Sequence, residues 1–381
     1  GSVIETLRRW LLPYCIGRLA LSRDAEADEE LRVGIGTIGA ITIVIASCAV
    51  FESVTHQNAL SILFGRNTEF MTRWGLRRAS GHAEHTLGFG LFFVCLIPWA
   101  IEAARQSRHR LMKNWGRWAP VFAVAGLIAT VSRGPWLAGC ITYAGVVFYR
   151  KPRWRAPMVT FALLGLVVVV GGRTQVTSLL NKAAGRDASE QYFVIVKGKV
   201  YEYTGTNHRY LQFLIYEEQV ARAGYVGFGT DGMWDFRRAA RREIHISQFP
   251  ARVPAMFYSI DSHYLYFLLE RGWIGIALWC CAALTAVYYY VITPMPGYQE
   301  LGFSLASAIL AIMLMLATVF SHPPFEGILL FMFGLASAWR IRGLTALNET
   351  QPESAQSRFD QEQLAGSHQP AGSAKASECP N

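Results

Sequence analysis

Arginine occurs in this sequence where an apolar, membrane-like chain seldom carries it. The segment from Thr130 to Trp136 reads TVSRGPW, which places Arg133 in a three-residue turn between two apolar runs. A guanidinium keeps its charge and offers five donors in a fixed fork, a geometry that suits a phosphate or pyrophosphate. The alternative is an arginine that extends to lipid headgroups. The residues alone leave both interpretations open.

A second arginine comes before a glycine-rich segment. Arg209 begins an apolar-periodic stretch that runs to Arg222, and glycines recur from Gly224 to Gly232. Glycine lets backbone N–H groups approach a ligand closely. The segment matches neither GxGxxG nor a Walker pattern, so a plain turn between two helices is the alternative.

Titratable groups come directly before a later apolar run. Asp261 and His263 flank Ser262, and Glu270 follows. A carboxylate or an imidazole at this place can accept a proton from a sugar hydroxyl. The alternative is that Asp261 or Ser262 caps a helix and that His263 is solvated.

The fourth segment, residues 77–88, contains Arg78, His82, Glu84 and His85. Two histidines alone make a poor metal site, and the spacing offers no third ligand. We therefore expect no metal here. Arg78 and His85 are predicted to line a cavity on the outer side of a membrane.

The elements that must position these residues are apolar runs. Of the 381 residues, 52% are hydrophobic and 17% are charged, against roughly 25% charged in soluble domains. This composition excludes a disordered protein and a disulfide scaffold, and it argues against a soluble enzyme. Hydropathy predicts about eight spans of roughly the length that crosses a bilayer. They are 33–51, 86–104, 118–132, 135–149, 157–172, 273–292, 301–320 and 325–341.

Lysine and arginine in short loops predict the orientation of the spans. The loops that follow the second and fourth spans are basic, which predicts that they face the cytoplasm. Residues 1–32 then form a cytoplasmic N-terminal segment, and 33–341 form the membrane domain. The chain begins with Gly1 and Ser2 in place of methionine, which leaves open whether further helices precede it.

Two further segments follow from this topology. Residues 173–262 face outward and are too long for a simple connection, so they are predicted to form a largely helical extracytoplasmic subdomain. Residues 342–381 are rich in Gln, Ser, Ala and Gly and are predicted to be a disordered cytoplasmic tail. Part of the positive charge behind the net charge of +9 lies in the predicted inner loops, and part lies on arginines that are predicted to face outward. The outward arginines indicate an anionic lipid partner, and nucleic acid is not expected.

In this order, the four segments resemble the O-antigen ligase and O-antigen polymerase superfamily of bacterial membrane proteins. The resemblance covers roughly residues 75–340. It is carried by Arg78 with His85, by the Ser-Arg-Gly turn at 132–134, by Arg209 with the GYVGFG segment at 224–229, and by Glu270, Gly272 and Gly275.

The resemblance implies a multi-helix glycosyltransferase of GT-C-like type in the bacterial inner membrane. Its substrates would be glycans linked to undecaprenyl pyrophosphate, transferred to the lipid A core of lipopolysaccharide by ligases or joined into longer chains by polymerases. It implies that Arg133 and Arg209 hold the donor pyrophosphate in place of a metal, that no cofactor is used, and that transfer is inverting. Asp261 or His263 would be the base, with Arg78 and His85 in the same cavity.

One departure from the family pattern concerns the base. Many ligases carry His-Asn eleven residues before the glycine of the Glu-x-Gly element, whereas this chain has Asp261-Ser262 at that distance from Gly272. A polymerase is therefore slightly favoured over a ligase. The alternatives are a transporter or flippase of lipid-linked oligosaccharide, which would carry charged residues in its spans and repeat symmetry, and an inactive scaffold.

Overall fold

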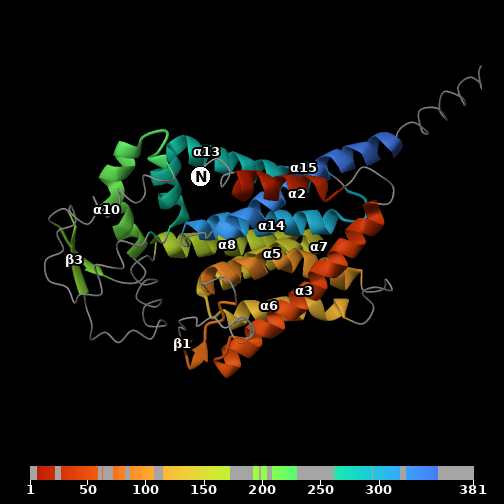
Figure 1. The fold of residues 1–381 in the computed structure, drawn as a ribbon, viewed down its shortest axis with the longest axis horizontal. Helices are drawn as coiled ribbons and strands as arrows, with labels where there is room; N and C mark the ends of the chain where they lie inside the picture. Colours follow the sequence, from red (N-terminus) through yellow and green to blue (C-terminus); the bar gives the residue numbers. More distant parts are fainter. Residues whose placement is uncertain are drawn as a thin grey trace, which may run out of the picture.

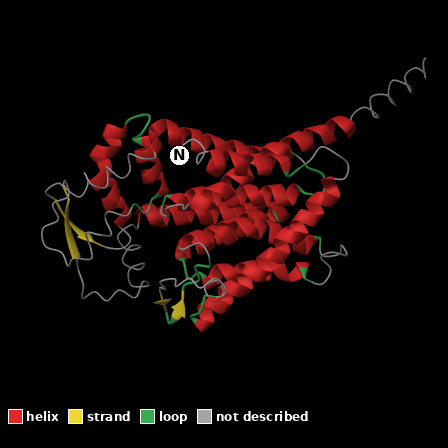
Figure 2. Ribbon diagram, viewed as in Figure 1, coloured by secondary structure: helices red, strands yellow, loops and turns green. Residues whose placement is uncertain are grey.

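The computed structural model of the protein is a bundle of long helices that lie side by side, with small β-hairpins near one end (Figures 1 and 2). The structure describes residues 7–21, 27–58, 62, 72–81, 86–106, 115–171, 192–196, 199–203, 208–229, 260, 262–293, 295–317 and 323–350.

Each of the eight predicted spans corresponds to one helix of the structure. This outcome confirms an all-α, polytopic membrane fold. In lipid, a backbone can pair its own polar groups only as a helix or a closed barrel, so apolar runs of this length become helices. They are α3 (Ala27–Thr55), α5 (Thr86–Arg105), α6 (Ala119–Ala129), α7 (Arg133–Arg150), α8 (Arg155–Gly171), α13 (His263–Ile292), α14 (Gln299–Leu316) and α15 (Pro323–Thr350).

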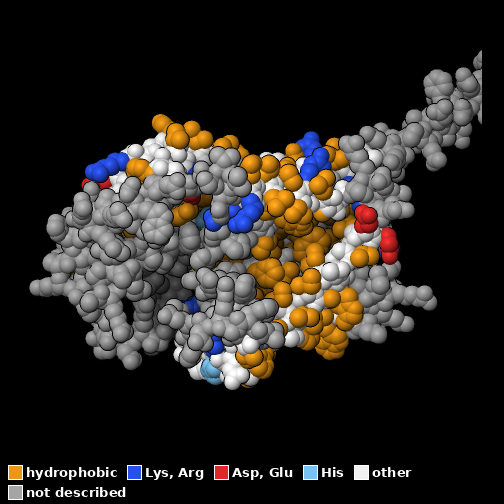
Figure 3. Space-filling model, in the orientation of Figure 1, with side chains coloured by type: hydrophobic (Ala, Val, Ile, Leu, Met, Phe, Trp, Pro, Cys, Tyr) orange, Lys and Arg blue, Asp and Glu red, His pale blue; other side chains and the backbone are white. Residues whose placement is uncertain are grey.

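Within the described residues, five helices are long and apolar enough to cross a membrane, judged by length and composition. Hydrophobic side chains cover much of the bundle surface seen in Figure 3, as expected of helices that face lipid. Short 3-10 turns, η3 (Gly116–Trp118) and η4 (Pro152–Trp154), come before α6 and α8. The five helices span Glu29–Thr55, Thr86–Arg105, His263–Ile292, Gln299–Leu316 and Glu326–Ala346.

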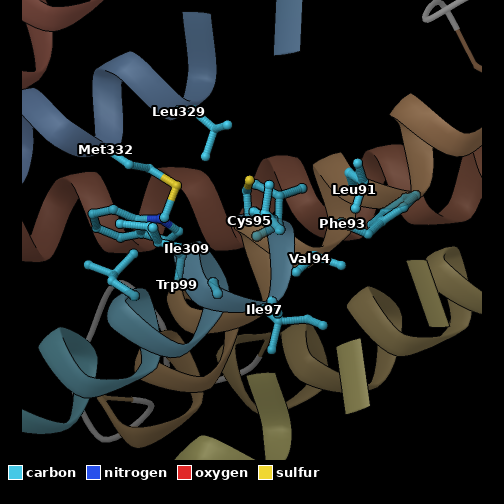
Figure 4. Close-up of a cluster of buried hydrophobic side chains, with 14 of the residues drawn as sticks. Leu91, Phe93, Val94, Cys95, Ile97, Trp99, Ile309, Leu329 and Met332 are labelled. Atoms are coloured by element: carbon cyan, nitrogen blue, oxygen red, sulfur yellow. The ribbon is translucent and has the colours of Figure 1, made fainter. Parts of the chain in front are cut away.

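Helix α5 lies at the centre of the bundle and packs on α3, α6, α7 and α14. From α14 the packing continues to α13 and then to α15. Figure 4 shows the buried cluster at this centre, where Cys95 and Ile97 of α5 lie near Ile309 of α14 and Leu329 and Met332 of α15. The core therefore joins the two halves of the chain.

A buried carboxylate lies near the C-terminal end of α5. Glu102 is 1% exposed and accepts hydrogen bonds from Arg105 Nε at 2.9 Å and from Gln106 Nε2 at 2.8 Å. Arg105 also donates to the carbonyl of Gly297, just before α14. Because Arg105 is the last residue of α5, this contact lies at the opposite end of that helix from Thr86.

The chain ahead of α3 packs in the bundle, which the sequence did not predict. The π-helical turn η1 (Leu7–Leu11) and α2 (Leu12–Leu19) follow α15 in the same direction, with Gly17 against Phe331. Trp10 lies 5.8 Å from the ring of Phe267 in α13. Hydropathy does not reveal these elements, because η1 and α2 together are shorter than a membrane span. The sidedness of residues 1–32 stays a prediction.

Two predicted boundaries differ from the structure. Helix α13 begins at His263, ten residues before the predicted span, because its first turns mix polar and aromatic residues that lower the hydropathy. Helix α15 continues to Thr350, into the range predicted as a disordered tail from residue 342. Residues 351–381 of that tail lie outside the described residues.

The long segment 173–262 is described in part, and that part is not entirely helical. Strands β3 (Tyr192–Val196) and β4 (Lys199–Tyr203) form an antiparallel hairpin. Helix α10 (His208–Ala223) confirms the predicted helix at Arg209 to Arg222. Figure 1 shows α10 beside the first turns of α13.

The predicted sidedness can be tested with two exposed positions, one in the β1–β2 hairpin, which contacts the turn before α7, and one directly after the end of α7. In a background without native cysteines, Gly75→Cys is expected to react with a membrane-impermeant maleimide in intact spheroplasts. Lys151→Cys is expected to react only after permeabilisation, because it lies in the basic loop between α7 and α8. Labelling in the reverse order would show that the predicted orientation is inverted.

Candidate functional site

A β-hairpin with a two-residue turn carries a cluster of arginines. Strands β1 (Thr72–Arg73) and β2 (Leu76–Arg77) pair antiparallel around Trp74 and Gly75. Both turn residues have positive φ, 53° for Trp74 and 74° for Gly75, as a type I′ hairpin requires. The Arg73 guanidinium lies 5.7 Å from the Trp74 ring centroid.

The turn between α6 and α7 is ordered by its own polar groups. The Thr130 hydroxyl donates to the Leu127 carbonyl at 2.7 Å, and the Ser132 hydroxyl donates to the Thr130 carbonyl at 3.0 Å. The indole N–H of Trp136 also donates to Leu127, at 2.9 Å. These contacts fix the entry into α7.

Arg133 is the first residue of α7 and is partly exposed. The sequence placed it in a three-residue turn, but the structure limits the turn to the residues before it. The first N–H groups of a helix have no partner inside the helix and carry a partial positive charge. Arg133 therefore adds a full positive charge where the helix itself already favours an anion.

The structure joins the hairpin to this turn. The Arg78 guanidinium donates from Nη2 to the Ser132 hydroxyl at 2.8 Å, and the backbone N–H of Ala79 donates to the Ala129 carbonyl at 3.0 Å. Arg78 thus lies against the residue that immediately precedes Arg133. Two of the predicted binding residues, fifty-five positions apart in sequence, meet at one end of the bundle.

The electrostatics of this place favour an anionic ligand. Burial lowers the pKa of the Arg78 guanidinium from its ordinary value, and the positive charge of Arg73 lowers it further. Like charges that are held close together repel each other. An anion that bridges several guanidinium groups would relieve that repulsion and gain charge-assisted hydrogen bonds.

Two tryptophans flank the arginines. Trp74 at the tip of the hairpin is 59% exposed, and its ring centroid lies 6.2 Å from that of Trp136 in α7. Aromatic faces of this kind pack against apolar faces of ligands. The sequence analysis did not single out either residue, because their proximity depends on the hairpin turn.

Arg209 lies in the first turn of α10. The helix packs on α13, and Leu211, Gln212 and Tyr216 on its buried side are fully enclosed. The structure describes the backbone of Arg209 and thereby places it on α10, the helix that packs on α13.

The described part of the glycine-rich segment, residues 224–229, binds to a break in α13, which the sequence did not predict. Helix α13 breaks at Gly272, whose φ of 63° and ψ of −167° suit glycine alone. The freed N–H groups of Trp273 and Ile274 donate to the carbonyls of Gly224 at 3.4 Å and Tyr225 at 3.1 Å. In return, Phe228 N–H donates to the carbonyl of Leu269 at 2.8 Å. The segment docks backbone to backbone on the broken helix.

Of the two candidate bases, Asp261 and His263, the structure describes only His263. Asp261 lies outside the described residues. Ser262 is the N-cap of α13 and accepts from Leu265 N–H at 3.5 Å, which confirms the capping alternative for that residue. His263 is fully buried, not solvated, and its ring lies 5.0 Å from that of Phe267.

His85 also lies outside the described residues, as do His82 and Glu84. The structure therefore brings together Arg78, Ser132 and Arg133, and it places Arg209 and His263 at the two helices that pack on each other, α10 and α13. A residue that the sequence analysis missed, Glu52 of α3, contacts the same hairpin. Its only sequence signal is a carboxylate at the end of an apolar run.

Part of the chain matches a known protein family. Residues 118–280 match the family model described as O-antigen ligase. The matched region begins with α6 and ends within α13, so it contains the α6–α7 turn, α10 and the docked glycine segment. No curated protein matches the chain.

Proposed function

We propose that this membrane protein is a glycosyltransferase acting on glycans linked to undecaprenyl pyrophosphate, because the match of residues 118–280 to the O-antigen ligase family model supports the resemblance to the O-antigen ligase and polymerase superfamily. The family supports a role in membrane glycan assembly. The observation that carries the finer proposal is the contact of Arg78 with the Ser132 hydroxyl, which brings the Arg78 guanidinium to the residue that immediately precedes Arg133.

The proposed reaction is an inverting displacement at the anomeric carbon of the donor sugar. The acceptor hydroxyl oxygen attacks that carbon, the bond from the carbon to the phosphate oxygen breaks, and the electron pair leaves with undecaprenyl pyrophosphate. The hydroxyl proton passes to the Asp261 carboxylate, with His263 as the second candidate base. Arg133, Arg78 and Arg209 stabilise the charge that develops on the leaving group.

Each arginine has a separate task in this proposal. Arg133 approaches the pyrophosphate from the start of α7, where the helix dipole reinforces its charge. Arg78 adds a second guanidinium from the hairpin side, and Arg209 a third from α10. His85 is proposed to line the same cavity. The guanidinium groups neutralise the pyrophosphate, which is the task that a divalent metal performs in other phosphate-transfer sites.

The acceptor distinguishes a polymerase from a ligase. We favour polymerisation slightly, because Asp261 and Ser262 occupy the place of the His-Asn pair seen in many ligases. The localisation that follows is the bacterial inner membrane, with the reaction on the periplasmic face.

The function is tested by reconstituting the full chain in proteoliposomes with a lipid-linked oligosaccharide donor. A glycosyltransferase is expected to release undecaprenyl pyrophosphate and to lengthen or transfer the glycan, as seen on gels. A flippase would instead move the fluorescent donor between leaflets without changing its glycan. Loss of product in Arg209→Ala, with full activity in Arg153→Ala, is expected. Product formation by Arg209→Ala at the normal rate would contradict its assigned role.

A further inference from the structure

A buried carboxylate lies beneath the arginine hairpin. Glu52 is in the last turn of α3 and is 1% exposed. Removing a charge from water costs far more than packing returns unless the charge is paired and hydrogen-bonded. The partners of Glu52 therefore define what this side chain does.

All of the partners of Glu52 that the structure records lie on or beside one short segment, residues 77–81. The Arg77 guanidinium approaches Oε1 at 3.3 Å. The Ser80 N–H donates to Oε1 at 3.3 Å and the Ser80 hydroxyl at 3.2 Å, while Gly81 N–H donates to Oε2 at 3.0 Å. Asn58 donates to Oε1 at 3.2 Å and to the Gly81 carbonyl at 2.8 Å.

These contacts hold the chain on both sides of Arg78. Before it, Arg77 pairs with Glu52 and donates to the His56 carbonyl at 2.5 Å. After it, Ala79 is bound to the Ala129 carbonyl, and Ser80 is bound to Glu52. With both neighbours fixed, Arg78 has little backbone freedom, and its guanidinium is directed to Ser132.

We propose that Glu52 is a positioning residue that holds Arg78 in the donor pyrophosphate site. This inference rests on the proposed function, because Arg78 must bind the donor for its position to matter. Glu52 offsets the charge of Arg77, the neighbour that faces the protein interior, and not that of Arg78. The carboxylate thereby orders the hairpin without pairing with the guanidinium that is meant for the ligand.

The test compares the purified full chain with Glu52→Gln, which keeps the shape of the side chain and removes its charge. The first readout is limited trypsin digestion, followed by mass spectrometry at the bonds after Arg77 and Arg78. Because cleavage follows local opening, Glu52→Gln is expected to be cut at least about tenfold faster at these bonds. This readout does not depend on the function.

The second readout is binding of undecaprenyl pyrophosphate, measured by thermophoresis in detergent. Misplacing a binding group by a fraction of an ångström is costly, so Glu52→Gln and Arg78→Ala are each expected to weaken binding by about tenfold. The double variant is expected to bind no more weakly than Arg78→Ala alone, since the two residues act through one contact. A merely structural role would give additive losses.

Glu102→Gln is the matched control, because Glu102 is equally buried and also pairs with an arginine, at the other end of α5. It is expected to leave both readouts unchanged. If Glu52→Gln does not fold, Ser80→Ala removes one hydroxyl hydrogen bond to Glu52 and is expected to show both effects at smaller size.

The outcomes separate the inference from the function on which it rests. Faster cleavage in Glu52→Gln with normal binding, while Arg78→Ala binds weakly, overturns the positioning role and leaves the function intact. Normal cleavage and normal binding in Glu52→Gln overturn it as well. Normal binding in both Arg78→Ala and Arg133→Ala removes the pyrophosphate site itself, and the inference with it.

Discussion

Replacing Arg133 with alanine is expected to reduce glycan transfer by about 100-fold or more, the size of effect seen when one group that stabilises developing charge is removed. Arg133 is partly exposed at the start of α7, beside the Ser132 hydroxyl that binds Arg78. The Arg133 guanidinium and the dipole of α7 both stabilise negative charge on the leaving group at the same place. Alanine removes the guanidinium, which is the larger of these two contributions. Folding is expected to be unaffected, because the turn is held by contacts of Thr130, Ser132 and Trp136.

The measurement is the rate of product formation in proteoliposomes at equal protein, with thermal unfolding as the check on folding. Arg133→Lys is expected to recover part of the rate, since lysine keeps the charge and loses the planar fork. Arg153→Ala, an exposed arginine near the start of α8, is the control and should retain full activity. Normal turnover by correctly inserted Arg133→Ala would falsify the pyrophosphate assignment.

Gly272→Ala is expected to destabilise the protein by about 3 kcal/mol or more, because it combines a backbone penalty of about 1 to 3 kcal/mol with a steric overlap. The backbone at Gly272 has a conformation that side chains exclude, and a Cβ there would overlap the Tyr225 carbonyl. Gly227→Ala should act similarly from the other side, because its Cβ would meet the backbone of Glu270 and Arg271.

Gly224→Ala is a sharp control for this prediction. Gly224 also has positive φ, 58°, but a Cβ there meets nothing within 4 Å. It should therefore cost only the backbone term, about 1 to 2 kcal/mol. The measurement is the midpoint of thermal unfolding in detergent at a fixed scan rate, because membrane proteins often unfold irreversibly. Equal midpoints for Gly224→Ala and Gly272→Ala would show that the docked segment does not hold α13.

The helices were predictable because lipid leaves the backbone few choices. Each apolar run became a helix, and the basic loops between them are short. The beginning of α13 was not predictable from hydropathy, since His263 and Glu270 interrupt the apolar pattern. The role of the glycines was not predictable either, because it depends on the break at Gly272, far along the chain in another helix. Hairpins β1–β2 and β3–β4 are too short to leave a periodic signal.

The arginines of the candidate site were predictable from the sequence, but the residues that surround them and hold them in place were not. Arg78 and Arg133 stood out because arginine is rare beside apolar runs, and the structure shows the loop of one against the turn of the other. Glu52 was missed because its contacts reach across twenty-eight residues to Ser80, and no local pattern marks such a partner. Trp74 and Trp136 were missed for the same reason.

The break in α13 has a consequence for where an anion can settle. The break creates a further helix start after Gly272, besides the start of α7 at Arg133. The carbonyls of Gly224 and Tyr225 already occupy the N–H groups of Trp273 and Ile274, so the partial positive charge of that second start is cancelled by the protein itself. The amino end of α7, with Arg133 at its first position, is left as the one of the two that attracts a negatively charged ligand. The docked glycine segment thus closes, with its own backbone carbonyls, a helix start that would otherwise be open to an anion.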